Sequence, residues 1–254
     1  MRFTLLGSVE AIGGGGICTP PAPKVRQVLA LLLVRVNRLV RVEALIEELW
    51  REAPPKSAMT TAQTYIYHLR KMIEREGLAE RGEQVLQTQS FGYALRVAPE
   101  AVDVVEFERL ASRGRAELGA GRPEAAAAAL GRALELWTGP PLGNVACGPL
   151  LSTYALQLEE QRLRVLQLRI EAELQLGRER ELVGELRRLV AENPLNEWFN
   201  GQLIRVLHDV GRRNEALQTY QRLRVLLSEE TGLSPSVELQ RIHQGLLEED
   251  RVLP

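Results

Sequence analysis

Near the start of the chain, the apolar and polar positions change from an alternating pattern to a helical one. Residues 2–12 are rich in β-forming side chains in rough alternation, which predicts a short strand. The glycines at 13–16 predict a turn, and a proline-rich stretch then keeps the chain extended up to Lys24. Apolar side chains recur at intervals of three and four residues in 25–36 and again in 42–51, and this spacing predicts two helices.

The pattern then predicts a third helix and a β-hairpin. The helical pattern begins at Ser57 and continues to Gly77, which is a suitable end because glycine tolerates a positive φ. Residues 84–97 contain two β-rich runs around 90–92, as is typical of a hairpin. The predicted order of elements is therefore one strand, three helices and a hairpin.

After Pro99 the pattern predicts an all-helical second half. Gly or Pro residues separate consecutive helical segments, and one long loop interrupts them at 138–148. The expected helices cover roughly 103–119, 123–137, 149–176, 178–192, 195–210, 212–230 and 235–249. We therefore expect a mainly α-helical protein with a small β content, divided into domains of residues 1–97 and 98–254.

A repeated motif in the second half predicts pairs of packed helices. Gly177-Arg178 and Gly211-Arg212 lie 34 residues apart, which is the period of tetratricopeptide repeats. Gly121-Arg122 begins a third copy, at an offset that is not a multiple of 34. A small or apolar residue such as Ala216 follows and allows close packing, and Tyr220 is expected in the core. The motif indicates an all-α, tetratricopeptide-like domain.

The third predicted helix carries the candidate chemistry. One face is apolar, with members at spacings of four, three and four: Ala62, Ile66, Leu69 and Ile73. The opposite face presents hydroxyl, aromatic and cationic side chains: Thr60, Thr61, Thr64, Tyr65, His68 and Lys71. Threonine can hydrogen-bond a base edge, and cationic groups neutralise phosphate. A solvated amphipathic helix would show the same pattern, but the hairpin that follows, with Phe91 and Tyr93, favours a DNA-binding helix beside a wing.

Charge also differs between the two halves. Residues 1–97 hold 13 Lys and Arg and 9 Asp and Glu, a net charge of +4. Residues 98–254 hold 19 and 24, a net charge of −5. A basic first half suits a polyanionic partner, although an excess of four charges is modest and supports the helix pattern without replacing it.

Motifs in both halves resemble known families. Residues 1–97 resemble an OmpR-type winged helix in the run Ile66-Tyr67-His68-Leu69-Arg70-Lys71 and in Gly92-Tyr93. The remainder resembles the bacterial transcriptional activation domain in four segments: Leu136–Leu142, Leu158–Leu163, Gly211–Tyr220 and Glu230–Pro235. Together, and over nearly the whole chain, the two halves are similar to the Streptomyces antibiotic regulatory protein family.

The resemblance implies a pathway-specific transcriptional activator of antibiotic or secondary-metabolite genes. Such a protein binds double-stranded promoter DNA at direct repeats near the −35 region, as a dimer or tandem pair, and recruits RNA polymerase holoenzyme with its sigma factor. Thr64 and His68 would face bases, and Gln89 in the wing would lie near the minor groove. Side chains near the phosphates would be Thr60, Thr61, Tyr65, Tyr67, Arg70, Lys71, Lys24 and Arg26.

One departure from the family pattern affects the expected affinity. Many winged-helix relatives place Arg where this chain has Tyr67, His68 and Gln89. Because fewer fixed charges contact phosphate, one subunit should bind DNA more weakly and depend more on cooperative partners.

Two other classes of protein fit the sequence less well. A protein-interaction module would use the helical repeats for a partner and the winged domain for protein contacts only, and a duplex-binding assay separates it from a DNA-binding activator. An enzyme would need a site that the sequence does not show. No Ser/His/Asp or paired-carboxylate arrangement has supporting context, so neither catalytic residues nor a cofactor is expected.

Metal and membrane sites are not expected either. His68 has no second ligand near it in the sequence, and Cys18 and Cys147 belong to no C-x-x-C pair, which suggests ordinary thiols. The chain contains no run of about 18 apolar residues and no signal-peptide pattern, so we expect a cytoplasmic protein associated with the nucleoid.

Overall fold

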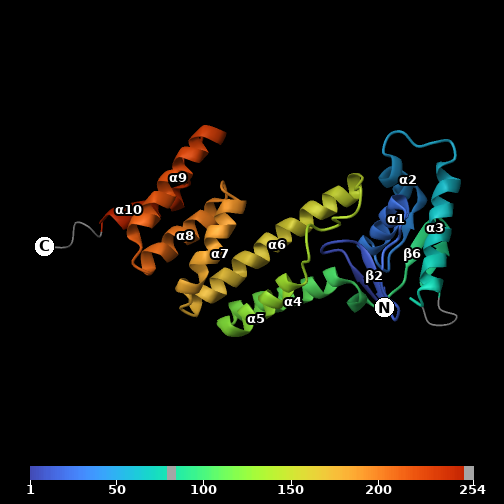
Figure 1. Ribbon diagram of the computed structural model, residues 1–254, viewed down its shortest axis with the longest axis horizontal. Coiled ribbons are helices and arrows are strands. Elements are labelled where there is room, and N and C mark those ends of the chain that lie inside the picture. Colours follow the sequence, from blue (N-terminus) through green and yellow to red (C-terminus); the bar gives the residue numbers. More distant parts are fainter. Residues whose placement is uncertain (79–83, 249–254) are drawn as a thin grey trace. The chain divides into compact units, whose positions relative to one another are not determined.

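The computed structural model describes residues 1–78 and 84–248, and the chain forms two compact units (Figure 1). The first unit comprises residues 1–169 and holds every described strand together with the helices up to most of α6. The second comprises residues 170–254 and is helical over its described part. Within the described ranges, no helix is both long and apolar enough to cross a membrane.

A three-stranded antiparallel sheet begins the first unit, in the order β1–β2–β3. Its strands are β1 (Arg2–Thr4), β2 (Glu10–Gly13) and β3 (Gly16–Cys18). The prediction of one strand over 2–12 is wrong, because the chain reverses around Gly7. A Cβ at Gly7 would lie 2.0 Å from Thr138 Oγ1, so this turn requires a glycine. The predicted turn at 13–16 is confirmed, since β2 and β3 pair across it.

Three mutually contacting helices follow: α1 (Pro23–Val34), α2 (Val42–Trp50) and α3 (Ala58–Arg75). They are drawn blue to cyan in Figure 1. Pro23 begins α1 because its fixed φ suits a first helical turn, where no N–H is needed. After α3 the chain turns at Gly77, whose φ is 59°. All three helices confirm the sequence prediction, with ends that differ by no more than two residues.

A second three-stranded sheet forms the wing, in the order β4–β6–β5. Its strands are β4 (Val40–Arg41), β5 (Leu86–Gln89) and β6 (Gly92–Leu95). The hairpin of β5 and β6 confirms the prediction, whereas β4 was missed because two residues are too few to show alternation. A Cβ at Gly92 would lie 2.0 Å from the backbone oxygen of Val40, so glycine allows β4 to approach.

Helical structure takes over after the short 3-10 helix η1 (Pro99–Ala101). The helices of this part are α4 (Asp103–Gly119), α5 (Pro123–Glu135) and α6 (Pro149–Gln175). Helices α4 and α5 pack along each other, and a Cβ at Gly114 would lie 2.4 Å from the Leu130 side chain. Gly114 therefore permits the close approach of these two helices.

The loop 138–148 joins the helical part to the first sheet. The backbone N–H groups of Thr138, Leu142 and Gly143 donate to the backbone oxygens of Leu6, Leu5 and Gly7, at 2.8, 3.0 and 2.9 Å. The buried Asp103 carboxylate, in the first turn of α4, accepts from the N–H groups of Leu5 and Leu6 at 2.9 to 3.0 Å. These bonds satisfy backbone groups that the turn around Gly7 would otherwise leave unpaired.

The second unit is built from helix pairs, as the repeated motif predicts. Its described helices beyond α6 are α7 (Glu179–Glu192), α8 (Glu197–Asp209), α9 (Arg213–Thr231) and α10 (Val237–Glu248). Gly177 and Gly211 have φ of 71° and 79° and separate consecutive helices. Ala216 and Tyr220 are buried in α9, as expected. The predicted fold class, a winged helix followed by an all-α, tetratricopeptide-like region, is confirmed.

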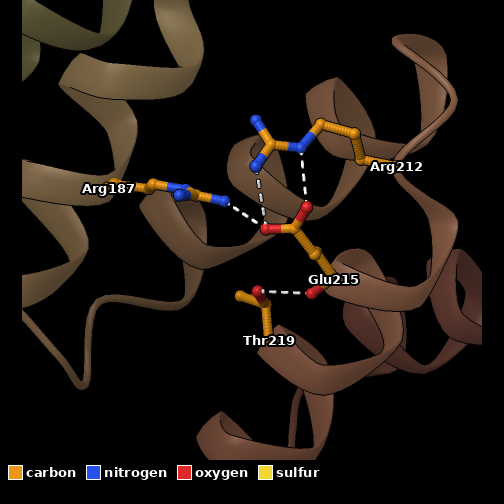
Figure 2. Close-up of polar contacts among 4 residues, drawn as sticks. All are labelled: Arg187, Arg212, Glu215 and Thr219. Carbon is orange, nitrogen blue, oxygen red and sulfur yellow. Dashed lines mark hydrogen bonds and ion pairs between the residues drawn. The ribbon is translucent and has the colours of Figure 1, made fainter.

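An exposed ion-pair network links two helices of this unit. The Glu215 carboxylate accepts from Arg187 of α7 and from Arg212, the latter at 2.7 and 3.0 Å, and the Thr219 hydroxyl donates to the Glu215 backbone oxygen (Figure 2). Arg212, and then Arg187, lower the pKa of Glu215. Because these side chains face solvent, their ion pairs add little to the stability of the fold. They hold the exposed edges of α7 and α9 next to each other.

Candidate nucleic-acid interface

Helix α3 has the two faces that its sequence predicts. Ala62, Ile66, Leu69 and Ile73 are all buried and hold the helix against α1 and α2. Met72 is also buried beside this stripe. A helix fixed along one side in this way presents its other side in a constant orientation, as reading of a DNA groove requires.

The opposite face of α3 is open to solvent along most of its length. Thr60, Thr64, His68 and Lys71 are exposed, whereas Thr61 and Tyr65 are half-buried. Thr64 is exposed, and its hydroxyl donates to the backbone oxygen of Thr60 at 3.0 Å, which leaves the lone pairs of the hydroxyl oxygen free to accept. The side chain can then accept from a base amino group and contact a thymine methyl.

Aromatic contacts orient three of the predicted site residues. The Tyr65 ring stacks on Trp50 of α2, with centroids 6.4 Å apart. Tyr67 is 54% exposed, meets the His68 ring edge-on at 5.8 Å and lies 5.3 Å from the Lys71 ammonium. Tyr67 raises the pKa of Lys71, chiefly through a side-chain hydrogen bond.

Arg70 lies on the side of α3 that faces the wing. Its guanidinium donates to the backbone oxygen of Leu86 at 3.1 Å and to the Thr88 hydroxyl at 2.7 Å. The sequence predicted that Arg70 contacts a DNA phosphate. In the structure Arg70 makes intramolecular hydrogen bonds that the sequence did not predict. It connects α3 to β5 and so fixes the wing relative to the helix.

The wing carries one polar and one aromatic candidate. Gln89 ends β5, is half-buried and pairs in register with Gly92. Phe91 is 65% exposed at the tip of the hairpin, and its backbone oxygen accepts from the N–H of Val42 at the start of α2. An exposed aromatic at a hairpin tip suits insertion into a groove or contact with a neighbouring protein.

The two basic residues of α1 are less available than the sequence predicts. The Lys24 ammonium donates to the backbone oxygen of Leu49 at 2.5 Å and to Gln27 Oε1 at 3.3 Å, so it satisfies the C-terminal end of α2. Arg26 is half-buried, and its Nε has no hydrogen-bond partner. Lys24 therefore supports the three-helix packing, and contact with phosphate would compete with that role.

Sequence reasoning missed basic residues that the fold places next to these elements. Lys56 is exposed directly before α3, and Arg41 is exposed at the junction of β4 and α2, next to the wing tip. The signal for Lys56 was its position one residue before Ser57. The signal for Arg41 was absent, because β4 was not predicted.

The structure offers nothing typical of a metal or redox centre in the part of the chain that it describes. No group of three or more His, Cys, Asp or Glu there could hold a metal ion. Cys18 and Cys147 are free thiols, and burial raises the pKa of each, which makes the reactive thiolate scarcer.

Trp137, Trp50 and Trp198 pack against neighbouring side chains. Trp137 is buried, with Phe107 at 5.5 Å and the Arg162 guanidinium at 4.9 Å. Trp50 and Trp198 are half-buried and contact Tyr65 and Phe199.

Two known domain families match the chain in sequence. Residues 102–247 match the bacterial transcriptional activator domain, and residues 19–95 match the transcriptional regulatory protein, C terminal. The second range covers α1 to β6, and the first covers α4 to α9 and most of α10.

Individual relatives match over the whole length of the chain. Regulatory protein DnrI of Streptomyces peucetius is 40% identical, over 98% of this chain and 93% of its own length. Regulatory protein AfsR of Streptomyces coelicolor is 37% identical over 100% of this chain, which spans only 25% of AfsR. The solved structure of Mycobacterium tuberculosis EmbR in complex with a low-affinity phosphopeptide matches with a TM-score of 0.90 and 31% identity, over 98% of this chain and 65% of EmbR.

The fold, the two domain matches and the relatives agree with one another. The matched relatives are named as regulatory proteins, and DnrI aligns along nearly its entire length. The chain therefore belongs to the Streptomyces antibiotic regulatory protein family, transcriptional regulators that join an OmpR-type winged helix to a bacterial transcriptional activator domain.

Proposed function

We propose that this protein activates transcription of antibiotic or secondary-metabolite genes by binding direct repeats near the −35 region and recruiting RNA polymerase holoenzyme. The observation that supports it most directly is the exposed Thr64 and His68 face of α3, beside a wing with an exposed aromatic tip. A helix of this shape fits the major groove, and a hairpin beside it reaches the adjacent backbone or minor groove.

The proposed division of labour follows the two domain matches. Residues 1–97 bind DNA, and residues 98–254 hold neighbouring copies together and offer a surface to polymerase and its sigma factor. Two copies on tandem sites multiply their affinities, because the second binds at a high effective concentration. Activation of this kind needs no chemical step and no cofactor.

The proposed DNA contacts fall into two classes. Thr64 and His68 read bases, and Gln89 lies near the minor groove. Contacts to the phosphate backbone come from Thr60, Thr61, Tyr65, Tyr67, Arg70, Lys71, Lys24 and Arg26. Because Arg70 and Lys24 also bind intramolecular acceptors, few cations are fully available, and binding by one subunit should depend only weakly on salt.

Selection of duplexes from a random pool, followed by electrophoretic shift, tests base reading. The Thr64→Ala/His68→Ala variant should lose specific retardation of the selected duplex while keeping weak non-specific binding. Thr153→Ala is the matched control, because Thr153 is also an exposed helical threonine that donates to the backbone oxygen four residues earlier. If the double variant and the wild type select the same sequences, α3 does not read bases.

The second candidate function is a protein-interaction module. A folded wild-type chain that selects no duplex, alone or with polymerase present, would favour it. An apolar groove of about 500 Å³, lined by Val190 of α7, Leu203 of α8 and Leu223 of α9 among others, would then be the first surface to examine.

A further inference from the structure

A cavity of about 760 Å³ lies beside the C-terminal half of α3. One side comes from the turn that leads into α1, through Pro20 and Pro21, and from Val25 in the helix itself. Met72 of α3 completes the apolar wall. A volume of this size is typical of sites that hold a small organic molecule, and rigid proline walls keep it open without a large ordering cost.

The rim of the cavity is predominantly basic. His68, Lys71 and Arg75 line it from α3, together with one acid, Glu74. Arg75 is 74% exposed at its side chain, bonds Glu76 through Nε at 2.7 Å and also interacts with the Cys18 thiol. An anionic group at this rim would be stabilised by Lys71 and Arg75, while an apolar body would lie against the prolines and Met72.

Two residues belong both to this cavity and to the proposed DNA-reading face. Both are exposed on α3, where His68 is a proposed base contact and Lys71 is a proposed phosphate contact. A ligand in the cavity would contact these side chains and present a negative charge next to the approaching phosphates. Bound ligand and bound DNA would therefore disfavour each other, and the coupling would be reciprocal.

We propose that this cavity binds a small amphipathic organic anion, with an aromatic or alicyclic body and a carboxylate or sulfonate, and that its occupancy opposes DNA binding. The regulatory half of this proposal rests on the proposed function, whereas the binding site itself does not. A free inorganic anion would leave the apolar walls unused, and a neutral apolar compound would leave the basic rim unused. The amphipathic anion is the class that uses both.

The probe for the site is 8-anilinonaphthalene-1-sulfonate, an aromatic anion that fluoresces when it leaves water. Titrated into the full chain, it should show a saturable component of one probe per chain. Arg75→Gln should weaken that component by about five- to tenfold, as loss of one partly exposed charge contact implies. The affinity for the neutral analogue N-phenyl-1-naphthylamine should differ by less than about twofold between the wild type and Arg75→Gln, since this analogue lacks the charge that Arg75 contacts.

Matched variants separate this cavity from other apolar surfaces. Arg222→Gln alters the rim of the groove between α7, α8 and α9 and should leave probe binding unchanged. Pro21→Asp places an acid in the cavity wall at an exposed position and should weaken the anionic probe more than the neutral one. Circular dichroism and thermal melts establish that each variant is folded.

Competition with DNA tests the regulatory half. Saturating probe should displace a fluorescently labelled selected duplex from the wild type, and excess duplex should release the probe. The proposed site would be overturned if the wild type and the two folded cavity variants, Arg75→Gln and Pro21→Asp, bound the probe with equal affinity. It would also be overturned if Arg222→Gln weakened probe binding and Arg75→Gln did not. A dimer that dissociates on Arg75→Gln would instead assign the cavity to a second copy of the chain.

Failure of the site and failure of the proposed function give different results. Simultaneous binding of probe and duplex at undiminished affinities would leave a binding site but overturn its regulatory role. A chain that binds the probe in the predicted manner but selects no duplex would overturn the proposed function and with it the regulatory half, while the site would stand.

Discussion

Oε1 of Glu48, in the last turn of α2, accepts a hydrogen bond from the backbone N–H of Gly148 at 2.5 Å, across 100 residues of chain. Oε2 of the same carboxylate accepts from the N–H groups of Leu150 and Leu151, at 2.9 and 3.2 Å. These N–H groups belong to the first turn of α6 or immediately precede it, where helices lack internal acceptors and carry a partial positive charge. Glu48, only 2% exposed, is thus a buried cap that joins α2 to the start of α6.

Removing this cap should destabilise the first unit. Glu48→Ala leaves three N–H groups without their acceptor, and we expect it to lower the free energy of unfolding by about 3 kcal/mol. Glu47→Ala, at the exposed position one residue earlier, should change it by less than about 0.5 kcal/mol. Urea denaturation of the full chain, followed by tryptophan fluorescence, measures both. Equal midpoints for the two variants would show that the cap contributes nothing.

An independent variant tests the same joint from the other side. A Cβ at Gly148 would lie 2.2 Å from the Glu48 backbone oxygen and 2.8 Å from its carboxylate. Gly148→Ala should therefore push α2 and the start of α6 apart and destabilise the chain, whereas Gly184→Ala, at a helical position with open space, should be neutral or slightly stabilising. A Gly148→Ala protein as stable as wild type would contradict the packing described.

The Arg70 contact with the wing leads to a prediction about dynamics. Arg70→Lys keeps the charge but loses the fork that reaches Leu86 and Thr88 together, so amides of β5 and β6 should exchange with solvent about tenfold faster. Arg75→Lys, an exposed change on the same helix, should leave their exchange unaltered. Hydrogen exchange measured by mass spectrometry reports both. If amide exchange in β5 and β6 is the same in Arg70→Lys and in the wild type, the contacts of Arg70 do not hold the wing, and its side chain would be free to contact phosphate.

The sequence predicted α3 and its two faces because a helix repeats its pattern over many residues, and 18 residues of α3 are ample for the apolar stripe to show. It did not predict β4, which has two residues and no detectable period. The sequence identified candidate residue types, but it did not show which of these side chains are engaged within the fold. Lys24 and Arg70 are basic residues at expected positions, but their backbone acceptors, on Leu49 and Leu86, lie 25 and 16 residues away in sequence, so only the tertiary fold shows these contacts. Glu48 gave no signal at all, since the backbone N–H groups that it caps follow 100 or more residues later.

His243 gives the second unit a predictable dependence on pH. Its ring stacks on Tyr220 with centroids 4.0 Å apart, and burial, followed by the nearby Arg224, lowers the pKa of the imidazole. The unfolded chain binds a proton at His243 more readily than the folded chain does. The free energy of unfolding is therefore highest above the ordinary histidine pKa of about 6.5 and decreases as the pH falls below it. Thermal melts at pH 8 and pH 5.5 should show a larger acid loss for wild type than for His243→Phe, which keeps an aromatic ring against Tyr220. Parallel pH dependences of the two proteins would exclude His243 as the cause.

The scarcity of free cations on the proposed DNA-reading face leads to a prediction about operator geometry. If one subunit binds weakly, occupancy requires two copies on one face of the duplex, and the repeats must then be separated by whole helical turns of roughly 10.5 base pairs. Inserting about half a turn between selected repeats should reduce affinity to that of a single site, and inserting a full turn should restore much of it. Mass photometry of the complexes counts the copies bound at each spacing. Two copies bound with the same affinity at every spacing would mean that each subunit binds independently, and Thr64, His68 and the few exposed cations would then have to supply the whole affinity themselves.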